Sequence, residues 1–419
     1  MMRNLKITLT LLLMSLASVL MAQETEKALA ENPMRAGCTY HSYEAPTDDV
    51  TTPAPKGYKP VYISHYGRHG SRYHSELMIN QNYPRELLYA DSLGLLTDTG
   101  KIILNELMTV YKVHEGMLGE LSQKGFKEHQ GIAERMYASF PQIWKDRKTV
   151  NGISSNYSRC VLSMGAFTGR LQALVPGLSV SAVSGKKYFS IVANEVEYHE
   201  EAVEEVAEWE KAERVKRFDP SRMAALLFKV IPEDLDVQQA IKSIHIYGSI
   251  TESLEYELGG YINIFRWFTP EELHTLWSIY SDVWYGEQCD SEEYGKFVMA
   301  STGKILSHVV ENADKALAED SDVAADLRFG HDNGLMPLVF ALGFEGADRI
   351  PYAESYKVYP DYRYNCKASN IQMIFYRNAK NDVLVKVLYN EKETRLKDLS
   401  PVTGPYYKWS DVRSYLLNR

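Results

Sequence analysis

The sequence is poor in cysteine. Only 4 of its 419 residues are cysteines, and the wide spacing of Cys38, Cys160, Cys289 and Cys366 excludes a small scaffold stapled by disulfides. No Cys-x-x-Cys pair exists, so the usual ligand spacing of a structural zinc site is missing as well. Cys160 lies in an apolar helical pattern, which leaves a buried free thiol and a disulfide both open for it.

The chain also has no excess of positive charge. The formal net charge is -9, and the densest basic segment is the short stretch 211–217. We therefore expect no broad positive face for nucleic acid, and an anionic substrate has to be held by a local basic pocket. With 45% hydrophobic and 24% charged residues, the composition is that of a globular protein with a large core.

Long apolar runs are missing beyond the first residues. Arg3 and Lys6 precede the apolar stretch 7–21, which ends just before the polar Gln23. This layout is typical of a secretory signal peptide, and the stretch is short of the roughly 20 residues that a membrane anchor needs. We predict a signal peptide at 1–22, export to the periplasm or the medium, and no membrane span in the mature chain.

Apolar, β-rich runs alternate with helical patterns along most of the chain, which predicts an α/β sheet. The predicted strands are 58–64, 149–154, 178–183, 325–330, 371–376 and 383–388. Between 190 and 300, Glu-rich and Ala-rich helical segments predominate instead. The predicted organisation is an α/β domain in two parts, 23–189 and 301–419, with an inserted, mostly helical cap at 190–300.

Two helices near the predicted site have clear boundaries. Ser122 can cap a helix that begins at Gln123. A second helix is predicted from Arg159 to about residue 174, because apolar residues recur at helical spacing until Pro176 and Gly177 stop it.

The residues most suited to chemistry are in the decapeptide 64–73, Ser-His-Tyr-Gly-Arg-His-Gly-Ser-Arg-Tyr, which follows an apolar run. Arg68 and Arg72 can hold phosphate oxygens by charge-assisted hydrogen bonds, and His69 is a nitrogen nucleophile between them. Glycines at 67 and 70 are expected to let the backbone approach a ligand closely. His331 and Asp332 follow another predicted strand, and strand ends are where open α/β sheets place their ligands. The pattern predicts a phosphate-transfer site.

Four segments resemble those of a known family. Arg68-His69-Gly70-Ser71-Arg72 matches the Arg-His-Gly-x-Arg signature of the histidine phosphatase superfamily, and His331-Asp332 is similar to the His-Asp motif of its acid phosphatase and phytase branch. The segment 155–167 resembles the one in which the family places a third arginine, here Arg159, and 119–125 looks like the family's helix-opening segment.

The resemblance implies a phosphoglycerate mutase-like fold and a phosphohistidine intermediate. His69 would be the nucleophile and Asp332 the proton donor, and the phosphoryl group would be bound by Arg68, Arg72, Arg159 and His331. The guanidinium groups are expected to lower the pKa of His69, and a bound phosphate dianion to raise that of Asp332. An acidic or near-neutral pH optimum is the consequence.

The substrate stays open between two classes. The segments 370–376 and 385–392 look like the multiple inositol polyphosphate phosphatase group, which favours phytate or another inositol polyphosphate. That group typically carries His-Ala-Glu where this chain has His331-Asp332-Asn333, and His74 stands where the branch usually has proline. The alternative is a broad acid phosphatase acting on sugar phosphates and similar esters. Lys186 and Lys187 are predicted to add charge to a specificity pocket, with a solvated surface as the other interpretation.

Other classes are less consistent with the residues. His65, His69 and His74 could suggest a metal-dependent hydrolase, but the interleaved arginines would repel a divalent cation, so we expect neither a metal nor a cofactor. A phosphate-binding protein would need neither His69 nor Asp332. Export favours hydrolysis over a phosphomutase reaction, so the expected partner is a small anionic phosphomonoester.

Overall fold

The structure is a computed structural model that describes residues 24–47, 51–193, 199–260, 262–300 and 302–419. The predicted signal peptide at 1–22 lies outside these ranges. None of the described helices has both the length and the apolar character that crossing a membrane requires.

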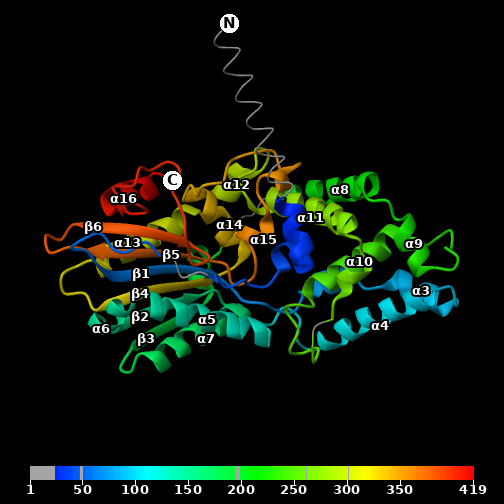
Figure 1. Cartoon of the computed structure of the whole chain (residues 1–419), viewed down its shortest axis with the longest axis horizontal. Coiled ribbons are helices and arrows are strands. Elements are labelled where there is room, and N and C mark those ends of the chain that lie inside the picture. The colour runs from blue at the N-terminus through cyan, green and yellow to red at the C-terminus, as the bar shows by residue number, and fades with distance from the viewer. Residues whose placement is uncertain (1–23, 48–50, 194–198, 261, 301) are drawn as a thin grey trace, which may run out of the picture.

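A mixed eight-stranded sheet runs through one half of the molecule (Figure 1). Its order is β3-β2-β4-β1-β5-β6-β7, and β8 pairs with β6. The first four of these strands are parallel, and the remaining pairings are antiparallel. The strands are β1 (Lys59–Arg68), β2 (Thr149–Ser154), β3 (Ser179–Ser184), β4 (Val323–Gly330), β5 (Asn370–Arg377), β6 (Val383–Tyr389), β7 (Lys392–Glu393) and β8 (Tyr407–Lys408).

This sheet confirms the predicted α/β class, and each predicted strand is present. The largest difference is at β1, which continues to Arg68 instead of ending at residue 64. The extra residues are polar and contain Gly67, so they read as a loop. They adopt an extended conformation because β4 and β5 pair with them on both sides, so that their backbone N–H and C=O groups are hydrogen-bonded.

Helices cover both faces of the sheet. On one side lie α5 (Gln123–Ser139), α6 (Pro141–Asp146) and α7 (Ser158–Leu174), and on the other lie α13 (Thr302–Ala316), α14 (Asp332–Ala341) and α16 (Trp409–Leu417) (Figure 1). Each side has its own cluster of buried apolar side chains. Both predicted helices exist, and the Ser122 hydroxyl accepts a hydrogen bond from the Gly125 amide at 3.3 Å, as a capping residue should.

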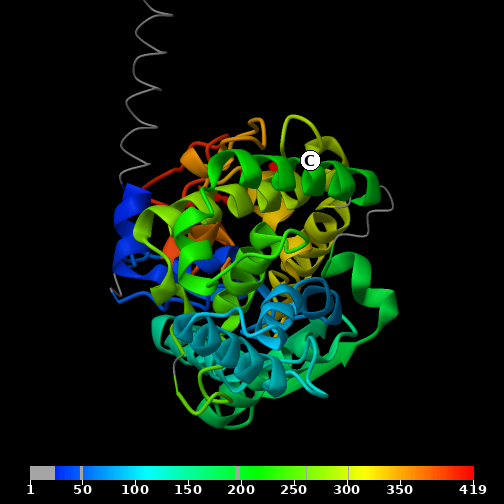
Figure 2. The same ribbon diagram turned by 90° about the vertical axis from the view of Figure 1, so that its right-hand side faces the viewer.

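A helical layer stands at one end of the sheet, and Figure 2 views the molecule from that end. Most of its helices contribute side chains to a third apolar cluster. They are η1 (Pro33–Tyr40), α2 (Glu76–Gln81), α3 (Arg85–Ser92), α4 (Asp98–Val113), α8 (His199–Arg217), α9 (Ser221–Leu227), α10 (Val237–Ile250), η3 (Ile264–Trp267) and α11 (Pro270–Gln288). Helices α2 to α4 precede residue 190, so the layer draws on more of the chain than the predicted cap, whose boundaries stay a prediction.

The remaining short elements connect these layers. They are η2 (Lys186–Ile191), α12 (Gly295–Met299), η4 (Ser355–Lys357) and α15 (Asp361–Tyr364). All four cysteines are buried and free. The structure therefore selects the free-thiol alternative for Cys160.

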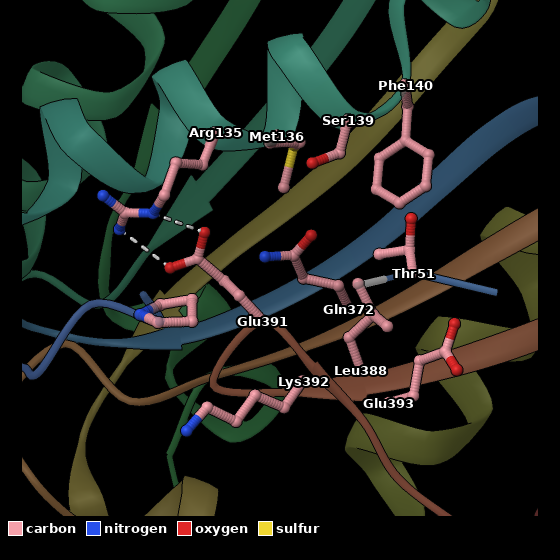
Figure 3. A pocket seen from close by; sticks show the side chains of 11 residues that line it. Thr51, Arg135, Met136, Ser139, Phe140, Gln372, Leu388, Glu391, Lys392 and Glu393 are labelled. Atoms are coloured by element: carbon pink, nitrogen blue, oxygen red, sulfur yellow. Dashed lines mark hydrogen bonds and ion pairs between the residues drawn. The ribbon is translucent and has the colours of Figure 1, made fainter. Parts of the chain in front are cut away.

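An ion pair ties the antiparallel edge of the sheet to α5 (Figure 3). The turn between β6 and β7 is made by Asn390 and Glu391, which both have positive φ, of 47° and 66°. The Glu391 carboxylate accepts hydrogen bonds from Arg135 Nε and Nη2, each at 2.8 Å, and from the Tyr43 hydroxyl at 2.7 Å. These bonds hold a turn conformation that usually requires glycine or asparagine. The adjacent pocket, about 80 Å³, is lined by none of the predicted site residues.

Candidate functional site

The site forms where three neighbouring parallel strands end. Arg68, the last residue of β1, pairs with Gly330, the last residue of β4. The His69 amide donates to the Gly330 carbonyl at 2.9 Å, so His69 and His331 leave the sheet side by side. On the other side of β4, β2 ends at Ser154 and leads into α7, whose first turn carries Arg159. The topology thus brings the widely separated motifs to one edge of the sheet.

The His69 ring is buried, with one nitrogen engaged. Its Nδ1 lies 2.9 Å from the Gly70 carbonyl oxygen, so Nδ1 carries the proton and donates, and Nε2 keeps its lone pair. Burial, followed by the charges of Arg159 and Arg72, holds the pKa of His69 well below its usual value. The ring is therefore a neutral nucleophile even in mildly acidic solution.

The three predicted arginines lie around this ring. Arg68 is fully buried and donates to the carbonyl oxygens of Thr39, at 2.8 Å, and Asn365. Arg72 donates to the Tyr73 carbonyl at 2.7 Å. Arg159 approaches His331 Nδ1 at 3.4 Å. The Nε of each guanidinium is buried and has no hydrogen-bond partner among the described residues, so each keeps a donor for an anionic ligand.

His331 contributes a second neutral ring. Its Nε2 lies 2.8 Å from the Ser155 hydroxyl, and its ring centroid is 5.7 Å from that of His69. Burial and the charge of Arg159 lower the pKa of His331 to about 3. The two histidines therefore add no charge to the site at neutral pH.

Asp332 begins α14 and faces the cations. Arg68 Nη2 donates to its Oδ2 at 2.7 Å. Burial by itself would raise the pKa of Asp332, but the charges of Arg68 and Lys367 outweigh it and hold that pKa below its usual range. The carboxylate is ionised in the ligand-free site, so a role as proton donor requires that it gains a proton when a substrate binds.

Lys367 is a fourth cation that the sequence analysis missed. Its Nζ is fully buried, has no hydrogen-bond partner among the described residues, and lies 4.4 Å from the ring centroid of Tyr40. Burial and the charges of Arg68 and Arg72 hold its pKa well below the usual value. Hydrogen bonds to the backbone of His41 and His69 fix residues 367 and 368 beside the decapeptide. The only signal in the sequence is a lysine between Cys366 and Ala368, directly before a buried strand.

The two glycines of the decapeptide are required for packing, and their predicted role in ligand approach stays a prediction. A side chain on Gly67 would come within 2.7 Å of the His65 ring, and one on Gly70 within 2.5 Å of the Gly125 carbonyl oxygen. Gly70 and Gly125 thus let the start of α5 approach the backbone of residues 70 and 71. His65 itself lies between Phe167 and Phe329, at ring-centroid distances of 5.1 and 5.3 Å.

A cleft of about 520 Å³ opens from the site into the helical layer. Arg72 and Asp332 lie on its wall together with Lys242, Trp284 and Glu287. Further lining comes from Tyr40, Leu77, Met78, Val203, Ala207, Glu210, His245, Tyr280 and Val283, among others.

The structure does not bring Lys186 and Lys187 into this lining. Both are exposed at the start of η2. The η2 segment still flanks the site, because the ring of Phe189 lies 6.1 Å from that of His331. Within the described ranges, the site included, no group of three or more His, Cys, Asp or Glu side chains is arranged to hold a metal ion.

No family model and no curated protein sequence matches the chain, but solved structures do. The multiple inositol polyphosphate phosphatase of Bifidobacterium longum superposes with a TM-score of 0.76 in its phosphate complex and 0.75 in its inositol hexasulfate complex. The identity is 17%, over 91% of this chain and 97% of that one. The phytase of D. castellii gives a TM-score of 0.70 at 13% identity, over 92% of this chain and 85% of its own. The chain therefore has the fold of these inositol phosphate phosphatases, over nearly its whole described length.

Proposed function

We propose that this protein is a metal-independent phosphomonoesterase of the histidine acid phosphatase type. The observation that carries the proposal is the environment of His69. A neutral imidazole with a free Nε2 lies among the basic groups of Arg68, Arg72, Arg159 and Lys367, with the Asp332 carboxylate paired to Arg68. A phosphoryl dianion supplies the negative charge that this site lacks, and the unpartnered arginine donors match its oxygens.

In this proposal the reaction has two steps. His69 Nε2 attacks phosphorus, and the N–P bond forms as the ester P–O bond breaks and Asp332 gives a proton to the leaving oxygen. Water then attacks the phosphohistidine, Asp332 takes a proton from that water, and the N–P bond breaks to release phosphate. Substrate binding favours the protonated form of Asp332, because the dianion adds negative charge beside it and draws on the charge of Arg68.

An inositol polyphosphate such as phytate is the substrate that the fold favours. The B. longum enzyme, of which 97% is covered, was solved with inositol hexasulfate, a polyanion of the same shape. Lys186 and Lys187 could meet outer phosphates from η2, next to the site. Replacing both by alanine is expected to weaken phytate hydrolysis more than p-nitrophenyl phosphate hydrolysis.

A broad acid phosphatase acting on smaller esters is the second candidate. The observation in its favour is the cleft wall, which carries the carboxyl groups of Glu210 and Glu287 and apolar groups such as Trp284. Its one lysine, Lys242, is paired with Glu210 at 2.9 Å. Such a wall suits a leaving group with little charge.

Export belongs to the proposal as well. The layout of residues 1–22 supports it, and the amino-terminal sequence of the protein recovered from the periplasm or medium tests it. A mature chain that begins near Gln23 is expected, whereas a retained leader would contradict export by a cleaved signal.

The central experiment compares wild type, His69→Ala and Asp332→Asn on phytate and on p-nitrophenyl phosphate. We expect His69→Ala to be inactive on both. Asp332→Asn should lose about 10²-fold or more in kcat on phytate and much less on the aryl ester, since nitrophenolate leaves without protonation. Full activity of His69→Ala would end the proposal, and equal losses for Asp332→Asn would remove its role as acid.

A further inference from the structure

A second carboxyl group lies in the cleft beside Asp332. Glu287 is near the end of α11 and lines the same cleft as Arg72 and Asp332. Helices α11 and α14 pack directly against each other, and a carboxyl group from each of them lines the same cleft. Neither the family motifs nor the periodicity of the sequence singles out Glu287.

Its surroundings differ from those of the other glutamate in the wall. Glu210 is held by two cations, Arg214 and Lys242, each at 2.9 Å. In the described part of the chain, Glu287 forms no ion pair, and the charged group that acts on it is the like charge of Asp332. A carboxyl group placed in a partly apolar wall next to a carboxylate is poorly suited to be ionised.

Other titratable groups face the cleft without reaching Glu287 as partners. They are Cys38 and Tyr40 on η1, Arg72 in the decapeptide, Glu210 on α8, Lys242 and His245 on α10, and Tyr280 on α11. Burial and the charge of Asp332 raise the pKa of Glu287 to about 7, while the cations hold that of Asp332 below its usual range. Below about pH 7 the free site therefore holds one protonated and one ionised carboxyl group.

We propose that Glu287 is the proton reserve of Asp332: it is a positioning residue in the same cleft and supplies, through water in that cleft, the proton that Asp332 gives to the leaving group. The inference rests on the proposed phosphatase function and deepens it. It also explains how an Asp332 that is ionised in the ligand-free site can act as an acid, because the proton needed by the leaving group is held by Glu287 in the same cleft.

The proton balance is simple. When His69 Nε2 attacks phosphorus, Glu287 passes the one proton of this carboxyl pair to Asp332, and Asp332 gives it to the leaving oxygen as the ester P–O bond breaks, which leaves both carboxyl groups ionised. In the second step water attacks phosphorus, its proton returns to the pair, and the N–P bond breaks. Each turnover restores the single shared proton.

The test uses Glu287→Gln, which keeps the shape but cannot release a proton as an acid. On phytate or glycerol 2-phosphate, whose alkoxides need protonation, we expect kcat to fall about 10²-fold. On p-nitrophenyl phosphate the loss of kcat should be less than about 3-fold, because the nitrophenolate leaving group needs little protonation by a general acid. The alkaline limb of kcat/KM for alkyl esters, near pH 7 in wild type, should move to more acidic pH in the variant.

Glu210→Gln is the matched control, since Glu210 lines the same cleft but is neutralised by cations. We expect it to leave the pH profile and the alkyl-to-aryl ratio unchanged. The double variant Glu287→Gln with Asp332→Asn should be no slower on alkyl esters than the slower single variant, because the pair acts as a unit.

Two outcomes would overturn the inference: equal losses on alkyl and aryl esters for Glu287→Gln, or an unshifted alkaline limb. Its failure is distinguishable from that of the phosphatase proposal. If His69→Ala is inactive and Glu287→Gln resembles wild type, only the carboxyl pair is wrong. If His69→Ala is active, the phosphatase mechanism itself is wrong.

Discussion

At the scale of single residues, Lys367 adds a further buried basic group to the site. Burial and three arginines oppose the charge of Lys367 more than Asp332 favours it, and its Nζ has no hydrogen-bond partner among the described residues, so an ammonium at this position costs folding free energy. Such a cost is expected where a bound anion offsets it. The arrangement indicates that this site lowers the folding stability of the protein until an anion such as a phosphoryl group binds.

Replacing Lys367 with methionine tests this. We expect kcat/KM to fall about 10²-fold on any phosphomonoester, as when one preorganised donor is removed. The ligand-free variant should be more stable than wild type by about 1–4 kcal/mol, because an uncompensated buried charge is gone. Steady-state kinetics and urea unfolding without phosphate measure the two effects.

Lys386→Met is the control for that variant. Lys386 is equally buried but paired with Glu393 at 2.9 Å, so its loss should destabilise the protein and leave kcat/KM unchanged. Wild-type activity in Lys367→Met would exclude Lys367 from phosphoryl binding.

At the scale of elements, η1 connects the helical layer to the nucleophile strand. The Thr39 carbonyl of η1 accepts a hydrogen bond from Arg68. The next residues are anchored by His41, whose Nδ1 lies 3.0 Å from Glu252 Oε2, just beyond α10, and whose Nε2 lies 3.2 Å from Glu44. The placement of Arg68 therefore depends on a contact between elements far apart in sequence.

This anchor predicts a pH dependence of stability. Burial by itself would lower the pKa of His41, but Glu252 and Glu44 outweigh it and raise that pKa to about 9. Because the folded-state pKa lies above the unfolded value of about 6.5, the contribution is fully present below pH 6.5 and is lost as the pH rises through 9. We expect the free energy of unfolding to fall by about 1–3 kcal/mol over this window, measured by urea unfolding.

His41→Gln should remove most of that slope. His129→Gln is the control, since burial lowers the pKa of His129 to about 3 and its ring stays neutral throughout the window. A slope that survives in His41→Gln would show that another group causes it.

At the scale of the whole molecule, the site needs no resident metal in the proposed mechanism, because arginine and lysine supply the positive charge. We expect full activity after dialysis against excess EDTA. Loss of activity that zinc or another divalent ion restores would support the metal-dependent alternative instead. The matched observation is inhibition by inorganic phosphate, which should persist in EDTA.

Much of the fold could be predicted because its signals are local. The strands 149–154 and 383–388 are rich in β-branched residues, and Ser122 fits the capping pattern of its helix. The end of β1 could not be predicted, because residues 65–68 are strand only through pairing with β4 and β5. The antiparallel edge made by β5 to β8 could not be predicted either, because it depends on pairing between strands and not on local sequence.

The residues of the candidate site also fall into two groups: those that the sequence predicted and those that only the structure identified. By itself the sequence predicted the proposed chemistry, since a histidine between arginines indicates phosphoryl transfer and the resemblance to histidine phosphatases adds the distant His-Asp pair. Only the tertiary structure decided which further groups join them. Lys367 and Glu287 carry no motif, and their roles arise from burial and from neighbours hundreds of residues away, because electrostatic energies depend on distance in space and not on separation along the chain.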